Sequence, residues 1–184
     1  MKDVIFFDID TQYDFMHKDG RFYVPDAEKI IPNLDRITEF AKDRRISVIA
    51  SIDGYKFSSN KKIPGTRLSN VPSVPNKELN NEKLIKLKKK NRLIIEKQKH
   101  DVFSNPNTKK LLNNVKRAYV YGVATDYCVK AAVLGLREMG VETYVIKDAI
   151  KPVFKKNEKK YLSLFRKKGA KFLTTSELLK KKLI

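Results

Sequence analysis

Short apolar runs alternate along the chain with stretches in which apolar residues recur every three or four positions. The short runs are rich in β-branched and aromatic residues and too brief for helices, so they predict buried strands at 4–9, 46–52, 92–95, 118–123, 142–146 and 171–173. The spacing of three and four predicts helices over 30–41, 128–139 and 157–168. Pro32 indicates where the first helix starts, and Ser176 is expected to cap a further, terminal helix.

Strands and helices therefore follow one another in turn, which is typical of right-handed βαβ crossovers. The order predicts an α/β fold: a three-layer α/β/α, Rossmann-like architecture with a mainly parallel sheet of about six strands. We expect one domain over residues 1–184. The irregular, proline-containing stretch 53–81 is expected to form a lid or rim. Ligands of such folds lie at the carboxyl ends of the strands, near the point where the strand order reverses.

Composition narrows the setting of the protein. The chain has 184 residues. Its 40 Lys and Arg against 21 Asp and Glu give it a net charge of +19. The excess is scattered and mostly lysine, which favours a solubilising surface, and nothing resembles a nucleic-acid-binding motif. No run approaches the roughly 20 apolar residues of a membrane span. A single cysteine cannot form an internal disulfide, so we expect a cytoplasmic protein.

The predicted strand ends carry a coherent set of reactive groups. Asp8 and Asp10 follow the first strand, Asp53 the second, Lys97 the third, and Cys128 opens the helix after the fourth. Backbone amides and the helix dipole at that position are expected to lower the thiol pKa. A carboxylate accepts the thiol proton and an ammonium steadies the anion, which makes a nucleophile with its base. The alternative is that a lone cysteine at a helix start is only a small packed residue.

Four segments resemble the isochorismatase-like cysteine hydrolases, a superfamily that includes nicotinamidase. They read FFDIDTQYDFM, VPDAEKIIPNL, IIEKQKHDVFSNPN and VYGVATDYCVKAAVLGL, and together they extend over nearly the whole chain. The most specific is GVATDYCVKA, which is similar to the nucleophile segment of nicotinamidases almost letter for letter. The resemblance implies that Asp10 is the base, Lys97 the lysine and Cys128 the nucleophile of the family.

The resemblance also implies a cis peptide between Val123 and Ala124. The amides of Ala124 and Cys128 would then form the oxyanion hole. The implied reaction is attack by the Cys128 thiolate on a carboxamide carbon, loss of ammonia and hydrolysis of the thioester.

The sequence departs from nicotinamidases where they bind a metal. The family's Asp-x-His pair reads Asp53-Gly-Tyr55 here, and the stretch 61–66, where a further histidine would fall, holds lysines. One carboxylate is a poor divalent site, so we expect no tightly bound metal and no cofactor. Asp53 is left as a residual metal candidate or as a turn residue before Gly54.

Several residues are candidates for binding the substrate. Phe15 matches a family aromatic that lines the pocket, and Tyr55 and Tyr127 are further candidates, although each also fits a packing role. Lys61 and Lys62 could bind a carboxylate-bearing substrate or be solvated loop residues. His100, three residues beyond Lys97, could touch the pocket, although most histidines in such positions are bystanders. His17 is expected to be a surface residue.

We therefore expect a hydrolase acting on the amide bond of a small carboxamide, with a nicotinamidase-like activity as one candidate. The alternatives are a metal-independent hydrolase of an isochorismate- or carbamoyl-type molecule, or a catalytically idle binding relative. Asp8-Ile-Asp10 also resembles the nucleophile motif of haloacid-dehalogenase-type phosphatases, but Gln12 stands where those enzymes carry Thr or Val. The expected partner is a small molecule, without specific nucleic acid or membrane, and a homo-oligomer stays open.

Overall fold

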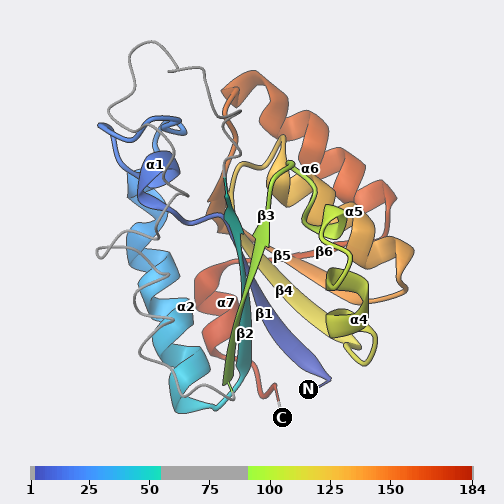
Figure 1. The fold of residues 1–184 in the computed structure, drawn as a ribbon. Helices are drawn as coiled ribbons and strands as arrows, with labels where there is room; N and C mark the ends of the chain where they lie inside the picture. Colours follow the sequence, from blue (N-terminus) through green and yellow to red (C-terminus); the bar gives the residue numbers. More distant parts are fainter. Residues whose placement is uncertain (1–2, 55–90, 184) are drawn as a thin grey trace.

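The chain folds around a single parallel sheet, drawn in Figure 1. The computed structural model describes residues 3–54 and 91–183. Its strands are β1 (Val4–Ile9), β2 (Ser47–Asp53), β3 (Arg92–Lys97), β4 (Arg117–Val123), β5 (Glu142–Lys151) and β6 (Lys171–Leu173). Their order is β3-β2-β1-β4-β5-β6, and each neighbouring pair is parallel. This confirms the predicted fold class.

The strand order reverses between β1 and β4. From β1 the chain adds β2 and β3 on one side, then returns to place β4 on the other side and continues outward to β6. In an open α/β sheet this switch leaves a crevice at the carboxyl ends of the two central strands. Asp10, directly after β1, and Cys128, shortly after β4, lie at this place.

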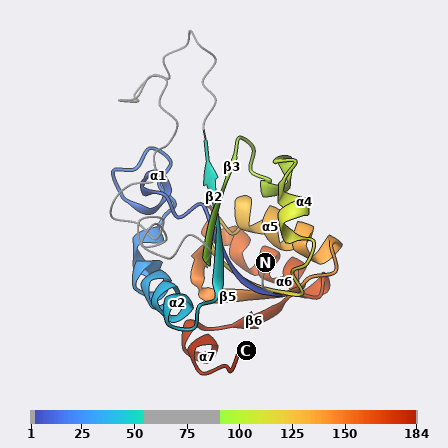
Figure 2. The same ribbon diagram turned by 60° about the horizontal axis from the view of Figure 1, so that its bottom comes forward.

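Helices cover both faces of the sheet, as Figures 1 and 2 show. The side chain of Phe6 packs in a core with α2 (Ile31–Asp43) and α7 (Thr175–Leu179). Its neighbours Ile5 and Phe7 point to the opposite face, where they meet α5 (Cys128–Glu138) and α6 (Glu158–Lys167). The short α4 (Thr108–Leu112) lies on this second side, and α1 (Tyr13–Met16) follows the first strand.

The sequence signals for helix ends are confirmed at most positions. Pro32 is in the first turn of α2, where its missing N–H costs nothing. Gly140 and Gly169 follow α5 and α6 with φ of 77° and 82°, the left-handed conformation that ends many helices.

The predicted cap of the last helix is wrong by two residues. Thr174, not Ser176, is the N-cap of α7. Its hydroxyl accepts a hydrogen bond from the Glu177 amide at 3.2 Å, and the Glu177 carboxylate accepts the Thr174 amide at 2.6 Å. This reciprocal capping box outcompetes the cap expected at Ser176, because the carboxylate that completes it lies three residues after Thr174.

Two features escaped the apolar pattern. β5 extends to Lys151, five residues beyond the predicted end. The pattern ended the strand early because the polar Lys147 and Asp148 interrupt the apolar run, and the register with β4 shifts after Val120. The short helices α1 and α4 have too few turns to show a period.

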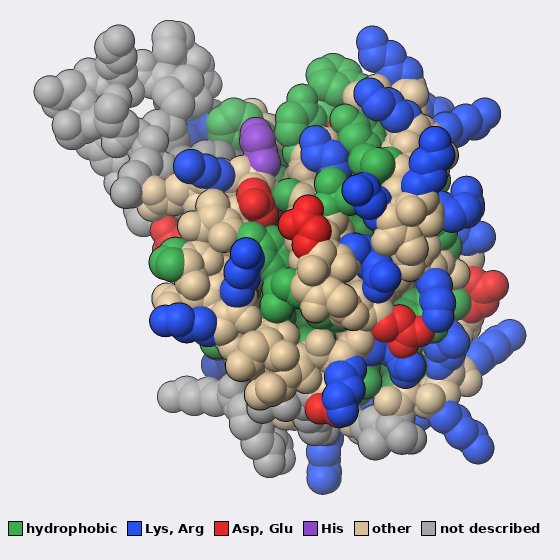
Figure 3. Space-filling model, turned by 90° about the vertical axis from the view of Figure 1, so that its right-hand side faces the viewer, with side chains coloured by type: hydrophobic (Ala, Val, Ile, Leu, Met, Phe, Trp, Pro, Cys, Tyr) green, Lys and Arg blue, Asp and Glu red, His purple; other side chains and the backbone are tan. Residues whose placement is uncertain are grey.

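The surface matches the expectation from composition. Figure 3 shows lysine and arginine side chains spread across one face rather than gathered in one patch. No helix in the described parts of the chain has the length and apolar character needed to cross a bilayer. Of the predicted rim over 53–81, residues 55–81 lie outside the described residues.

Candidate active site

Asp10 is fixed at the end of β1 by its neighbour strand. Its backbone turns out of the strand with φ of 50°, and its amide donates to the Ser51 carbonyl at 3.1 Å. The Ser51 hydroxyl donates to Asp10 Oδ1 at 2.6 Å. The carboxylate is therefore held in one orientation although it is almost completely buried.

Lys97 brings a positive charge to this carboxylate from the edge strand β3. Its Nζ lies 2.7 Å from Asp10 Oδ2 and 3.1 Å from Asp53 Oδ2. Burial alone would lower the pKa of Lys97, but the negative charges facing it, first that of Asp10, raise the pKa above its usual value. Lys97 therefore stays protonated and holds the two carboxylates together.

Asp53 is the second carboxylate that contacts Lys97, a role that the sequence did not predict. Burial raises the pKa of its carboxyl, while the Lys97 charge opposes this shift. The Gln12 side chain holds the Asp53 backbone in place: Gln12 Nε2 donates to the Asp53 carbonyl at 3.2 Å, and the Asp53 amide donates to Gln12 Oε1 at 2.6 Å. Sequence reasoning missed this use of Gln12, although the residue lies within the segment FFDIDTQYDFM that carries part of the resemblance.

Cys128 completes the cluster from the other side of the switch point. It is the first residue of α5, it is 6% exposed, and its Sγ lies 3.6 Å from Lys97 Nζ. The structure overturns the expected direction of the thiol pKa. Burial and then the negative charge of Asp10 raise it above its usual value, and the Lys97 charge opposes them only in part. The enclosure of Cys128 thus favours the neutral thiol over the thiolate.

The loop between β4 and α5 positions the thiol. The Val123–Ala124 peptide is cis, at the bond to which the resemblance assigns one. The Thr125 amide donates to the Lys151 carbonyl at 2.8 Å. The buried Asp126 carboxylate accepts the amides of Val153 and Phe154 at 2.8 and 3.0 Å. The nucleophile loop is thus tied to the segment that follows β5.

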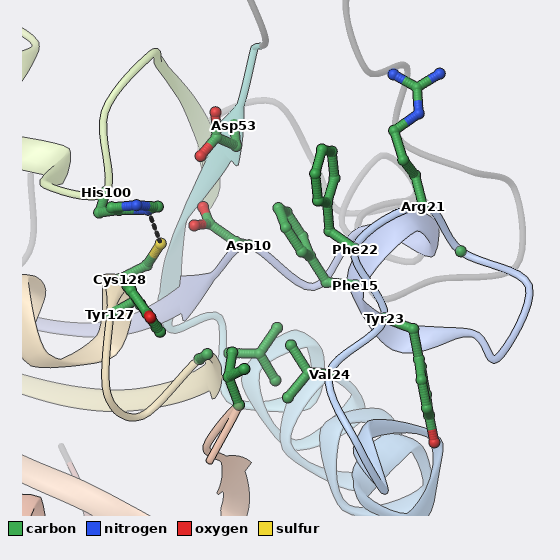
Figure 4. A pocket seen from close by; sticks show the side chains of 14 residues that line it. Asp10, Phe15, Arg21, Phe22, Tyr23, Val24, Asp53, His100, Tyr127 and Cys128 are labelled. Atoms are coloured by element: carbon green, nitrogen blue, oxygen red, sulfur yellow. Dashed lines mark hydrogen bonds between the residues drawn. The ribbon is translucent and has the colours of Figure 1, made fainter. Parts of the chain in front are cut away.

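A cavity of about 660 Å³ opens beside these groups. Figure 4 shows Asp10, Asp53 and Cys128 on one side of it, with Phe15 and Phe22 on the facing wall. Two of the three predicted pocket residues, Phe15 and Tyr127, line the cavity, and Tyr55 lies outside the described residues, as do Lys61 and Lys62. Phe22, Val24 and Val153 also line it and were not predicted. These residues lie in loops, and the position of a loop against the site cannot be predicted from a periodic pattern in the sequence.

His100 lines the pocket and lies beside the nucleophile. Its Nδ1 lies 3.9 Å from Cys128 Sγ, and its ring packs at 5.0 Å against the Tyr127 ring. The loop after β3 brings it there, only three residues beyond Lys97. His17 stacks on Tyr13 at 4.4 Å between ring centres and is partly exposed.

Asp8 is a neighbour of the site rather than part of it. It is fully buried and accepts the Thr11 hydroxyl at 2.8 Å. Burial raises the pKa of its carboxyl to about 7. A side chain so enclosed cannot attack phosphorus, which argues against the phosphatase alternative.

The donors of a nicotinamidase-type metal site do not fit this chain. Position 55 is tyrosine, and residues 61–66 include no histidine. No step of the reaction considered below therefore passes through such a metal.

Comparisons with known proteins place the whole chain in one group. The family model described as isochorismatase domain matches residues 4–177. The solved structure of a pyrazinamidase of Pyrococcus horikoshii in complex with zinc is 26% identical, with a TM-score of 0.75, over 94% of this chain and 99% of that one. A nicotinamidase from Bacillus subtilis is 18% identical, with a TM-score of 0.78, over 93% and 99%.

An N-carbamoylsarcosine amidase from Thermoplasma acidophilum shares the fold as well. It is 19% identical, with a TM-score of 0.74, over 96% of this chain and 98% of that chain. A search of curated proteins finds no match.

Proposed function

The chain belongs to the isochorismatase domain family of hydrolases, and from this premise we propose that it cleaves the C–N bond of a small carboxamide through a Cys128 thioester. The observation that carries the proposal is the buried contact of Lys97 Nζ with Asp10 Oδ2 at 2.7 Å and with Cys128 Sγ at 3.6 Å. A base, a cation and a thiol in one enclosed cluster supply what nucleophilic catalysis requires.

The reaction begins with proton transfer from the thiol to Asp10. Burial disfavours the thiolate, so Asp10 takes the proton as the sulfur attacks, and Lys97 stabilises the sulfur anion as it forms. The thiolate attacks the carboxamide carbon, and the amides of Ala124 and Cys128 receive the developing oxyanion. Donors fixed in advance at such a position are worth about 3 to 4 kcal/mol each in related chemistry.

The second half returns the proton and frees the enzyme. Asp10 delivers its proton to the departing nitrogen, so ammonia leaves and the acyl group remains on Cys128. Asp10 then accepts a proton from water, whose oxygen attacks the thioester carbon. The carboxylic acid leaves and the thiol is restored, which balances one water against one ammonia.

The cavity indicates a small, flat substrate. Phe15 and Tyr127 line its walls, and aromatic side chains favour stacking on planar groups. The family's metal donors, which would hold a pyridine nitrogen, do not fit here, so we propose that ring packing and the carboxamide contacts select the substrate.

We also propose the domain extent, the setting and the partners of the protein. One domain over residues 1–184 agrees with a family match that extends from 4 to 177. We propose that the protein acts on a small molecule in the cytoplasm and binds no specific nucleic acid. The scattered lysines in Figure 3 support the last point, because they form no single basic patch on the face shown. We also propose that no cofactor takes part in the reaction.

An ammonia-release screen tests the function. The panel contains nicotinamide, pyrazinamide, aliphatic carboxamides and carbamoyl compounds, each with wild-type protein and with Cys128→Ser, and each with and without a chelator. We expect release from at least one carboxamide by wild-type protein alone. Release from carbamoyl compounds only would support the alternative substrate class. No release from the entire panel, or loss of release on chelation, would contradict the proposal.

A further inference from the structure

Three potential metal ligands of different types converge beside the nucleophile. The Asp53 carboxylate, the His100 imidazole and the Cys128 thiol each offer an atom within 4.8 Å of the others. Figure 4 shows these side chains on the same side of the pocket. His100 is exposed, so an ion can reach the cluster from solvent. The set shares Asp53 with the metal-ligand pattern of nicotinamidases but differs from that pattern in its other two members, which are the nucleophile and a histidine from the loop after β3.

The donor set and its dimensions suit zinc. Zn²⁺ binds thiolate at about 2.3 Å and imidazole or carboxylate at about 2.0 Å, so tetrahedral geometry puts sulfur and nitrogen roughly 3.5 Å apart. Cys128 Sγ and His100 Nδ1 are 3.9 Å apart, and the Tyr127 ring beside the imidazole limits its tilt. A shift of a few tenths of an ångström at this pair, and a larger one at Asp53, completes the set. Three protein donors and a fourth, open position are common in zinc sites.

The charges of the cluster also favour a dication. With the thiol ionised, the site holds Asp10, Asp53 and the sulfur as anions against the single cation of Lys97. The excess of two negative charges equals the charge of one Zn²⁺. Lys97 contacts Asp53 through Oδ2, and its shorter contact with Asp10 lets the ammonium stay in place when the ion approaches Asp53.

We propose that Asp53, His100 and Cys128 form a thiophilic metal site at which Zn²⁺ or a similar ion blocks the nucleophile. Binding replaces the S–H bond by an S–Zn bond, and the proton leaves through the Asp10 carboxylate to solvent. The ion takes the sulfur lone pair that attacks the substrate, so zinc inhibits instead of assisting. The inhibitory effect rests on the proposed function, whereas the metal site itself does not.

Co²⁺ titration of the full-length, chelator-treated protein tests the site directly. Thiolate ligation gives Co²⁺ a near-ultraviolet charge-transfer band, which we expect with one ion per chain and which Zn²⁺ should abolish by displacement. Cys128→Ser should lose the band. His100→Gln and Asp53→Asn should each weaken Co²⁺ binding at least about tenfold, since even indirect partners of metal ligands contribute that much. His17→Gln, the matching change at the other histidine of the chain, should bind as wild type does.

Alkylation of Cys128 supplies a second readout that requires no folded variant. Saturating Zn²⁺ should slow labelling of the wild-type thiol at least about tenfold, and chelator should restore the rate. A missing charge-transfer band, unchanged affinity in both His100→Gln and Asp53→Asn, or labelling indifferent to zinc would each overturn the proposal. Neither readout depends on turnover, so a protein that hydrolyses none of the amides could still bind zinc here. A protein that hydrolyses an amide but binds no zinc would contradict the metal site alone.

Discussion

Lys97 Nζ lies 2.7 Å from Asp10 Oδ2, and both side chains are closed off from solvent. The two residues come from strands separated by β2 in the sheet, so the pair spans the middle of the candidate site. An uncompensated charge at either position would be costly in such an enclosure. The pair therefore serves stability and chemistry together, since the same ammonium also faces Cys128.

Removal of the Lys97 ammonium should lower both the stability of the fold and the rate of amide hydrolysis. Lys97→Met keeps the length of the side chain but leaves Asp10 and Asp53 without their common partner. We expect the free energy of unfolding to fall by about 3 to 5 kcal/mol and amide hydrolysis to fall at least about 100-fold. Chemical denaturation and ammonia release measure the two effects. Lys99→Met, the same change at an exposed neighbour, should alter stability by no more than about 0.5 kcal/mol.

The acidity of Cys128 should respond to its neighbours in a definite order. Asp10 raises the thiol pKa more than Asp53 does, after the larger effect of burial. Asp10→Asn should therefore move the pH midpoint of alkylation furthest down, Asp53→Asn less far, and Lys97→Met should move it up. The rate of iodoacetamide labelling against pH gives the midpoints. A larger shift in Asp53→Asn than in Asp10→Asn would show that the charges are arranged otherwise.

Asp8 should make stability depend on pH. Its carboxyl has a pKa of about 7 in the folded protein against an ordinary 3.8, so the folded state binds the proton more tightly than the unfolded state. The stabilisation is complete below about pH 4 and is lost as pH rises through about 7, by as much as about 4 kcal/mol. The difference in unfolding free energy between wild type and Asp8→Asn isolates this effect. If that difference stays constant from pH 4 to 8, the Asp8 account is wrong.

Gly122 should be indispensable for the placement of Asp10. It has φ of 111°, and a Cβ on it would collide with the carbonyl oxygen of Ile9, the residue before Asp10. Gly122→Ala should cost about 3 kcal/mol or more, from backbone strain and overlap together. It should also lower hydrolysis, because misplacement by an ångström is enough to cost about 100-fold.

Gly140→Ala is the matched control for this change. Gly140 also has a positive φ, 77°, but a Cβ there meets nothing within 4 Å. We expect about 1 to 2 kcal/mol of destabilisation without loss of activity. Equal costs at the two glycines, measured by denaturation, would show that contact with Ile9 does not matter.

Sequence patterns predicted the fold because they report on burial along each element. The apolar runs marked all six strands, and glycines marked the ends of α5 and α6. β5 was cut short because a strand interrupted by Lys147 and Asp148 no longer looks apolar. Register shifts of this kind depend on the neighbouring strand, which a local pattern does not contain.

The candidate site could be predicted only in part. The motifs named Asp10, Lys97 and Cys128, and the structure brings their side chains together. The sequence could place His100 near the pocket but not beside Cys128, because that closeness depends on how the loop after β3 meets α5. The thiol pKa was expected to fall because helix position is visible in sequence, whereas the burial that raises it is not.

The central claim is that Cys128 attacks the substrate. Its most direct test is the rate of ammonia release from the best carboxamide by wild-type protein and by Cys128→Ala, with folding of the variant verified by thermal unfolding. We predict a fall in kcat of at least about 1,000-fold, as expected when a nucleophile is removed. A folded Cys128→Ala protein that releases ammonia within about tenfold of the wild-type rate would contradict the account.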